Sequence, residues 1–126
     1  MPNFIPVLSD HAYQSALITT TNLQTKVELR LSVGSWNLLD RGFSKITHAR
    51  QEFSNNPYDA DETLENYEKR KRTQFNKIEQ NIRKHPEEDG DDIVFLQEVD
   101  FLLAGKQPVL AKMFKDMLDT HDFGLV

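Results

Sequence analysis

The sequence predicts an α/β fold in which helices flank a mixed or parallel sheet. Val27–Val33 alternates apolar and polar side chains, which is the period of a half-buried strand. Ile93–Leu96 is a continuous apolar run, the pattern of a short strand buried on both faces. Apolar residues at helical spacing lie between these two stretches and again after the second one. Strands that alternate with helices over short connections are typical of βαβ units.

The first half of the chain contains a predicted edge strand, a turn and a second strand. Ala16–Thr20 is apolar and β-branched, as expected of an edge strand, and Asn22–Gln24 is a turn signal. The strand that begins at Val27 continues through Gly34 into Trp36–Leu39, and the glycine indicates either a close backbone approach or a bulge near the strand end. A polar stretch, residues 40–61, follows and is expected to be a loop.

A helix is predicted from about Glu62 to Lys84. Its apolar stripe is interrupted by Lys71 and consists of Leu64, Tyr67, Phe75, Ile78 and Ile82. We expect the basic cluster Lys69–Arg72 to be a solvated helix face. Pro86 stops this helix, and the acidic residues 87–91 are expected to form a solvated turn.

The second half of the chain continues with the buried strand, a helix and a final strand. The helix is expected to begin at Pro108 and to present the apolar residues Val109, Leu110, Met113, Phe114, Met117 and Leu118. Phe123–Val126 has the composition of a further strand.

Composition limits the classes of protein to which this chain belongs. Its 126 residues suffice for one domain or a piece of a larger one, with 38% hydrophobic and 28% charged residues. A net charge of -5 provides no general attraction to nucleic acid. The absence of cysteine excludes disulfides and thiol chemistry. Neither a membrane span nor a signal peptide is recognisable, so we expect a cytoplasmic or otherwise intracellular protein.

Asn37 and Glu98 are the candidate site residues. Each follows an apolar strand, and ligands of open α/β sheets bind at the carboxyl ends of strands. A carboxylate with an amide oxygen suits Mg²⁺ or Mn²⁺ better than zinc. The alternative is that two buried strands simply end in polar residues where they reach solvent.

Three segments together carry a family resemblance: Leu31–Leu39 with its Trp-Asn pair, Tyr67-x-x-Arg70 on a helix, and Asp92–Asp100 with its Leu-Gln-Glu motif. In this order and spacing they resemble the opening of the endonuclease/exonuclease/phosphatase superfamily, the deoxyribonuclease I-like group. The resemblance covers residues 27–126 and implies the N-terminal half of a four-layered α/β sandwich, truncated, with residues 1–26 as an extension.

The resemblance also implies a site. Glu98 matches the glutamate that binds the catalytic Mg²⁺, Asn37 matches the asparagine beside it, and Arg70 matches a position taken as structural. The family's second half supplies an Asp-x-Asn pair, a further aspartate and a closing Ser-Asp-His, and we expect none of these motifs in this chain. We therefore expect its catalytic histidine to have no counterpart and do not assign that role to His121.

The function implied is that of a Mg²⁺-dependent phosphodiesterase or phosphatase whose 126 residues are inactive alone. Substrates in the family include nucleic acids, inositol phosphates and sphingolipids, and a nucleic-acid phosphodiester is favoured only by its frequency. Half of such a sandwich exposes one apolar sheet face, which predicts self-association or partner binding. Two alternatives therefore remain: a non-catalytic binding or regulatory module that uses this face, and an unrelated small α/β domain.

Overall fold

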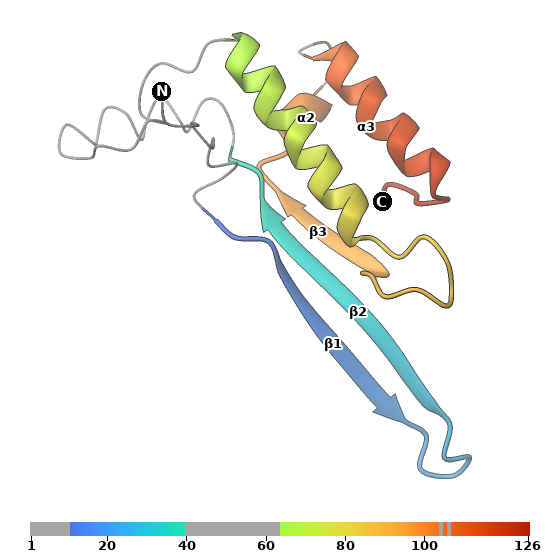
Figure 1. Ribbon diagram of the computed structural model, residues 1–126. Helices are drawn as coiled ribbons and strands as arrows, with labels where there is room; N and C mark the ends of the chain where they lie inside the picture. Colours follow the sequence, from blue (N-terminus) through green and yellow to red (C-terminus); the bar gives the residue numbers. More distant parts are fainter. Residues whose placement is uncertain (1–10, 40–63, 104, 106) are drawn as a thin grey trace, which may run out of the picture.

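The computed structural model describes residues 11–39, 64–103, 105 and 107–126 (Figure 1). The described strands are β1 (Gln14–Thr21), β2 (Glu28–Asn37) and β3 (Ile93–Gln97). The described helices are α2 (Leu64–Asn81), the short 3₁₀ helix η2 (Asp100–Leu102) and α3 (Pro108–Thr120). The predicted strands and helices are thus confirmed with small changes of bounds, except the last strand. The expected loop at residues 40–61 lies outside the described residues.

The sheet is mixed, as predicted, with the strand order β1-β2-β3. β1 runs antiparallel to β2, and β2 runs parallel to β3. The turn between β1 and β2 is built by Asn22, whose side-chain oxygen accepts the backbone N–H groups of Gln24 (2.9 Å) and Thr25 (3.1 Å). The described residues therefore have the general α+β class, with one sheet and helices on one side of it.

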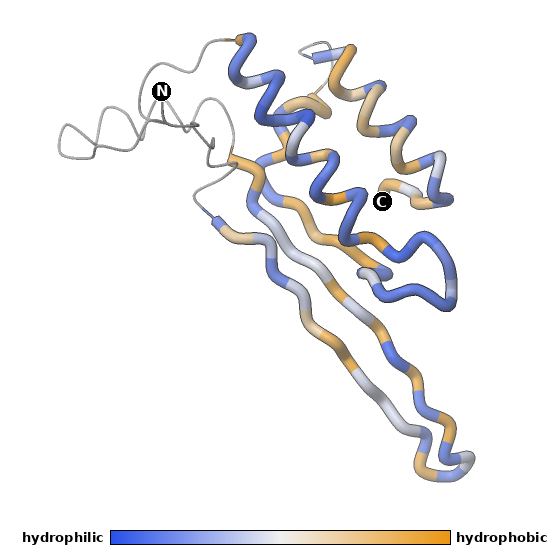
Figure 2. The backbone as a smooth tube through the Cα atoms, viewed as in Figure 1, coloured by the Kyte–Doolittle hydropathy of each residue, from blue (hydrophilic) through white to orange (hydrophobic). Residues whose placement is uncertain are grey.

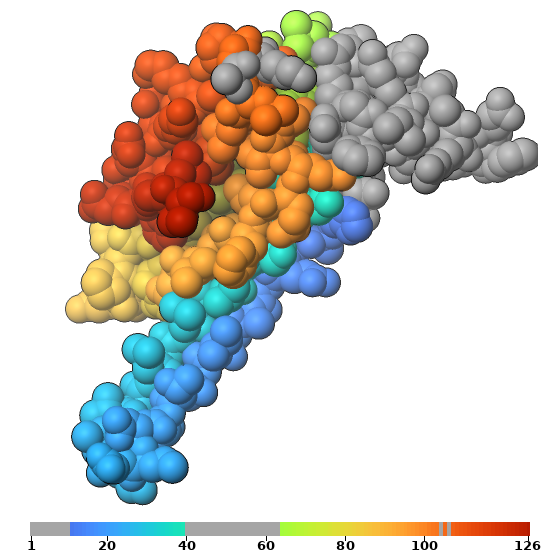
Figure 3. All heavy atoms as spheres, turned by 180° about the vertical axis from the view of Figure 1, so that it is seen from behind, coloured from blue at the N-terminus to red at the C-terminus, as the bar shows by residue number. Residues whose placement is uncertain are grey.

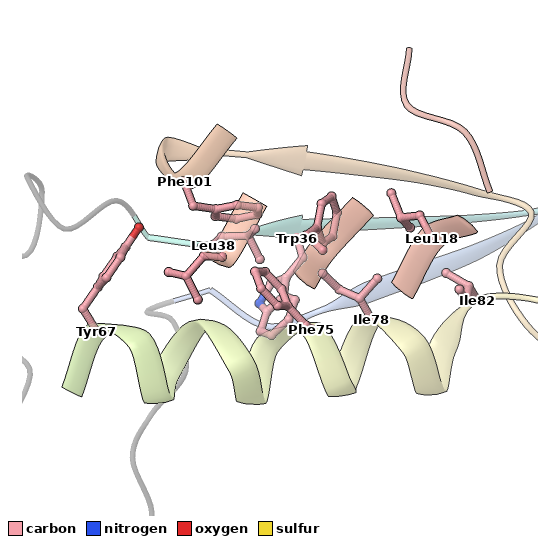
Figure 4. Packing of buried hydrophobic residues seen from close by; sticks show 10 residues of the cluster. Trp36, Leu38, Tyr67, Phe75, Ile78, Ile82, Phe101 and Leu118 are labelled. Atoms are coloured by element: carbon pink, nitrogen blue, oxygen red, sulfur yellow. The ribbon is translucent and has the colours of Figure 1, made fainter. Parts of the chain in front are cut away.

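The core lies between the sheet and the two long helices, α2 and α3, which run side by side (Figure 1). Figure 4 shows how its side chains pack. Three aromatic rings form its centre, one each from α2 (Phe75), η2 (Phe101) and α3 (Phe114). Their ring centroids are 4.9, 5.1 and 5.2 Å apart, within the range of favourable aromatic pairs. Trp36 and Leu38, at the end of β2, complete the contact between sheet and helices.

The opposite face of the sheet has no described layer over it. Ile93 pairs with Val33 and Phe95 with Ser35, so these side chains share one face, on which Ile93 is 42% and Phe95 58% exposed. β3 is hydrophobic along most of its length (Figure 2), yet only every second side chain is shielded. The prediction that β3 is buried on both faces is wrong for the described residues. Seen from behind, the hairpin and β3 lie at the surface (Figure 3).

The predicted strand at Phe123–Val126 does not form. Instead, the backbone N–H of Phe123 donates to the carbonyl of Leu118 at 2.9 Å, and Asp122 adopts a left-handed backbone with φ 57°. This closes the end of α3 in the manner of a C-terminal cap. Phe123 then packs against the core, so this residue belongs to the end of α3 and not to a strand.

One acidic residue of the expected solvated turn is buried. Asp91 is 2% exposed and accepts the hydroxyls of Tyr13 (2.5 Å), Ser15 (2.8 Å) and Ser32 (2.7 Å). Burial, and then the hydrogen bond to Asp91, raises the pKa of Tyr13, so the phenol stays protonated and donates. The cluster joins β1, β2 and the residues before β3, and the prediction of a solvated turn is wrong at Asp91.

The neighbouring Asp92 makes stability depend on acid pH. Hydrogen bonds from Arg83 (2.6 Å) and from the backbone N–H of Ser32 (2.9 Å) lower the pKa of Asp92. Because its pKa is lowered, the ionised Asp92 stabilises the fold at pH values above the unfolded pKa of about 3.9. This stabilisation is lost as the pH falls through the pKa of the folded state. Between about pH 5 and pH 2 the wild type should therefore lose more stability than Asp92→Asn, measured by urea denaturation. Equal losses in both proteins would contradict this.

Within the described residues, neither α2 nor α3 has the length and apolar character needed to cross a membrane.

Candidate functional site

The carboxyl ends of β2 and β3 meet at one edge of the sheet, where both candidate residues are found. Because the strands are parallel neighbours, Asn37 pairs with Gln97, and Glu98 is the next residue of the chain. The backbone N–H of Leu38 donates to the carbonyl of Gln97 at 3.0 Å and extends the pairing past the end of β2. Asn37 and Glu98 are both half-buried at this edge. Their binding of a metal stays a prediction.

Both strand ends carry an unfavourable backbone conformation. Leu39 has φ 57° and Glu98 has φ 56°, in the left-handed region that side chains other than glycine and asparagine rarely adopt. Such conformations cost about 1–3 kcal/mol each and cluster at functional sites. The left-handed conformation at Glu98 follows directly on the end of β3 at Gln97.

The donor atoms suit a hard cation. The side-chain oxygen of Asn37 accepts the backbone N–H of Leu39 at 2.9 Å. A carboxylate and an amide oxygen fit Mg²⁺, which is commonly held by one or two protein ligands and keeps several waters. Among the described residues, no three His, Asp or Glu side chains gather as a metal cluster.

Three polar side chains of α2 reach the same edge. Arg70 and Lys71 contact the carbonyl oxygens of both Leu38 and Leu39, at 2.8 and 2.9 Å for Arg70 and at 3.0 and 3.3 Å for Lys71. Gln74 donates to the carbonyl of Leu38 at 2.8 Å. All three are buried, with exposures of 0–2%. The expectation of a solvated basic face is therefore wrong at Arg70 and Lys71, because the stripe of α2 faces backbone carbonyls at this end.

His11 lies near this edge. β1 runs antiparallel to β2, with Gln14 paired to Ser35, so the residues before β1 lie beside the end of β2. The indole N–H of Trp36 donates to the backbone carbonyl of His11 at 2.9 Å. His121 does not lie at this edge, because its Nε2 is 3.2 Å from a carboxylate oxygen of Glu79 on α2.

The tripeptide Ser9-Asp10-His11 spells the closing motif that the family resemblance implies, but it precedes the first strand. The expectation that no Ser-Asp-His is present in this chain is therefore wrong, whereas the role of His11 stays a prediction. The tripeptide itself is the sequence signal for His11. Structure is described here only from residue 11 onward.

Comparisons with protein-family models, with curated proteins and with solved structures find no match to this chain.

The strain at Glu98 gives a testable stability difference. Glu98→Ala and Glu98→Gly both remove the carboxylate, but only glycine adopts the left-handed backbone without steric cost. We expect Glu98→Gly to be more stable than Glu98→Ala by about 1 kcal/mol in urea denaturation. An alanine variant at least as stable as the glycine variant would contradict the left-handed conformation.

Proposed function

We propose that this chain supplies the metal-binding part of a Mg²⁺-dependent phosphoric ester hydrolase of the endonuclease/exonuclease/phosphatase type. It corresponds to the N-terminal half of a four-layered sandwich. One observation carries the proposal: Asn37 and Glu98 end adjacent parallel strands at one edge, and Glu98 is held there in a left-handed conformation. Left-handed conformations of residues other than glycine cluster at functional sites.

In the proposed site Glu98 and Asn37 hold Mg²⁺ or Mn²⁺ through their oxygen atoms. The bound ion supplies polarisation of a phosphoryl oxygen. His11 lies beside the end of β2, where its backbone carbonyl accepts the indole N–H of Trp36. It is proposed as a further residue of this site because it ends Ser9-Asp10-His11, the tripeptide that the family resemblance implies in the active site.

The isolated chain is proposed to be inactive, since its sequence contains no Asp-x-Asn pair. The substrate is a phosphate ester, and a nucleic-acid phosphodiester is preferred on the frequency of nucleases in the family. The net charge of -5 means that such a substrate is held by local contacts and by the ion.

Two measurements on the full chain test this function. Titration with Mn²⁺, followed by electron paramagnetic resonance, should reveal a bound ion that Glu98→Gln loses and that the exposed-turn variant Glu88→Gln retains. A chromogenic phosphodiester incubated with Mg²⁺ should give no turnover above the Glu98→Gln background. Bound Mn²⁺ unaffected by Glu98→Gln would refute the site, and turnover dependent on Glu98 would refute the inactivity.

A second candidate function is supported by the uncovered sheet face. In this reading the chain is a non-catalytic binding module that associates with a second copy of itself. Four exposed apolar residues lie on that face by their pairing register: Ile18, Leu29, Ile93 and Phe95. β1, the edge strand beside them, contains no charged residue that would discourage pairing.

Sedimentation velocity separates the second candidate from the first. Self-association predicts a dimer for the wild type and a monomer for Phe95→Lys. The control Val109→Lys, at an equally exposed position on α3, should remain dimeric. A monomeric wild type that binds no apolar dye would dismiss this function.

A further inference from the structure

The peptide unit between Leu38 and Leu39 connects helix α2 to the side chain of Asn37. Its carbonyl, that of Leu38, accepts hydrogen bonds from α2. Its N–H, that of Leu39, donates to the side-chain oxygen of Asn37 at 2.9 Å. Because a peptide unit is planar, the orientation of the carbonyl determines the direction of the N–H. Whatever holds the carbonyl of Leu38 therefore also directs the carboxamide of Asn37.

The number of donors at this carbonyl exceeds what hydrogen-bond satisfaction requires. A carbonyl oxygen has two lone pairs, yet Arg70 (2.8 Å), Lys71 (3.0 Å) and Gln74 (2.8 Å) all donate to it. Two of these donors are cations, and burying a cation is costly even when it is hydrogen-bonded. One neutral donor would satisfy the carbonyl at lower cost. The extra donors therefore fix the direction of this peptide unit.

Lys71 extends the same arrangement to the other strand end. Its ammonium lies 3.7 Å from the carboxylate of Asp100, two residues after Glu98. It also lies over the ring of Phe101, 5.8 Å from the centroid. One buried lysine thus contacts the backbone after Asn37 and the residues after Glu98.

We propose that Arg70, Lys71 and Gln74 are positioning residues that act through the Leu38–Leu39 peptide to hold Asn37 beside Glu98. The consequence for metal binding rests on the proposed function. The link from α2 to Asn37 does not, because it consists of hydrogen bonds within the chain.

Local amide hydrogen exchange tests the link directly. In the full chain, Gln74→Leu removes one donor without changing charge, and Lys71→Met removes a second. Each should speed exchange of the Leu39 N–H about tenfold more than exchange of the Ile82 N–H, whose bond to Ile78 (3.0 Å) reports the core. The side-chain NH₂ signal of Asn37 should shift as well. Lys71→Arg should restore much of the protection, and the exposed control Lys69→Met should change neither amide.

A merely structural role gives a different result. If Gln74→Leu and Lys71→Met speed exchange at Leu39 and Ile82 by the same factor, the side chains stabilise the fold generally and the proposal is overturned. Should Lys71→Met fail to fold, Gln74→Leu decides by the same comparison.

Mn²⁺ affinity provides the second readout, and it distinguishes failure of the positioning role from failure of the proposed function. Loss of a positioning residue should weaken Mn²⁺ binding about tenfold, the usual effect of an outer-shell partner. Unchanged affinity in variants with a loosened Leu39 amide would overturn the role at the site. A wild type that binds no Mn²⁺ refutes the proposed function, and the exchange data then still decide the link.

Discussion

Replacing Phe75 with alanine is expected to destabilise the fold by about 3–5 kcal/mol, a large part of the roughly 5–15 kcal/mol that stabilise a typical domain. Phe75 is 4% exposed and contacts the rings of both Phe101 and Phe114. Its removal leaves a cavity where α2, η2 and α3 meet, and the edge that carries Glu98 loses its support. The free energy of unfolding, measured with urea and circular dichroism, should fall accordingly.

Phe95→Ala is the matched control for this loss. It removes the same side chain from the uncovered face, where Phe95 is 58% exposed and little burial is lost. A cost at Phe95 as large as that at Phe75 would contradict the description of the core and show that the sheet face is covered in solution.

Gly34→Ala is expected to have the second largest effect, about 2–4 kcal/mol of lost stability. A methyl group on Gly34 would lie 2.2 Å from the hydroxyl of Tyr13 and 2.6 Å from the carboxylate of Asp91. Those two groups are joined by a hydrogen bond, and the carboxylate of Asp91 also accepts the hydroxyls of Ser15 and Ser32. The substitution therefore breaks the bond or displaces β1.

Thermal and urea denaturation of Gly34→Ala measure this effect, with Gly124→Ala as the control. Nothing lies within 4 Å of a methyl group added at Gly124, so that variant should be within about 0.5 kcal/mol of the wild type. A Gly34→Ala protein as stable as Gly124→Ala would show that the cluster around Asp91 is not packed as described.

The sequence patterns predicted the strands and helices because each of these elements buries one of its faces. The alternation before Gly34 and the apolar stripe after Leu64 are direct consequences of one-sided burial, and both became elements of the structure. Burial of β3 was overestimated because an apolar run does not reveal whether a second layer is present. The burial of Lys71 and Asp91 was missed because charged residues are usually solvated, and their partners are distant in sequence.

The candidate site was predicted only in part. The sequence predicts that Asn37 and Glu98 lie at the carboxyl ends of two strands, and the parallel pairing of β2 with β3 places both residues at one edge of the sheet. The left-handed backbone at Glu98 has no sequence signal, since glutamate does not favour it. The proximity of His11 to this edge depends on antiparallel pairing of β1, which only the fold provides.

Paramagnetic broadening by Mn²⁺ tests the proposed metal site most directly. In ¹⁵N–¹H spectra of the full chain, substoichiometric Mn²⁺ should broaden the amide signals of residues 37–39 and 97–99 first. Glu98→Gln should abolish that broadening while leaving the spectrum otherwise folded. Broadening confined to the exposed acidic residues 87–89, or unchanged by Glu98→Gln, would contradict a metal site at the carboxyl ends of β2 and β3.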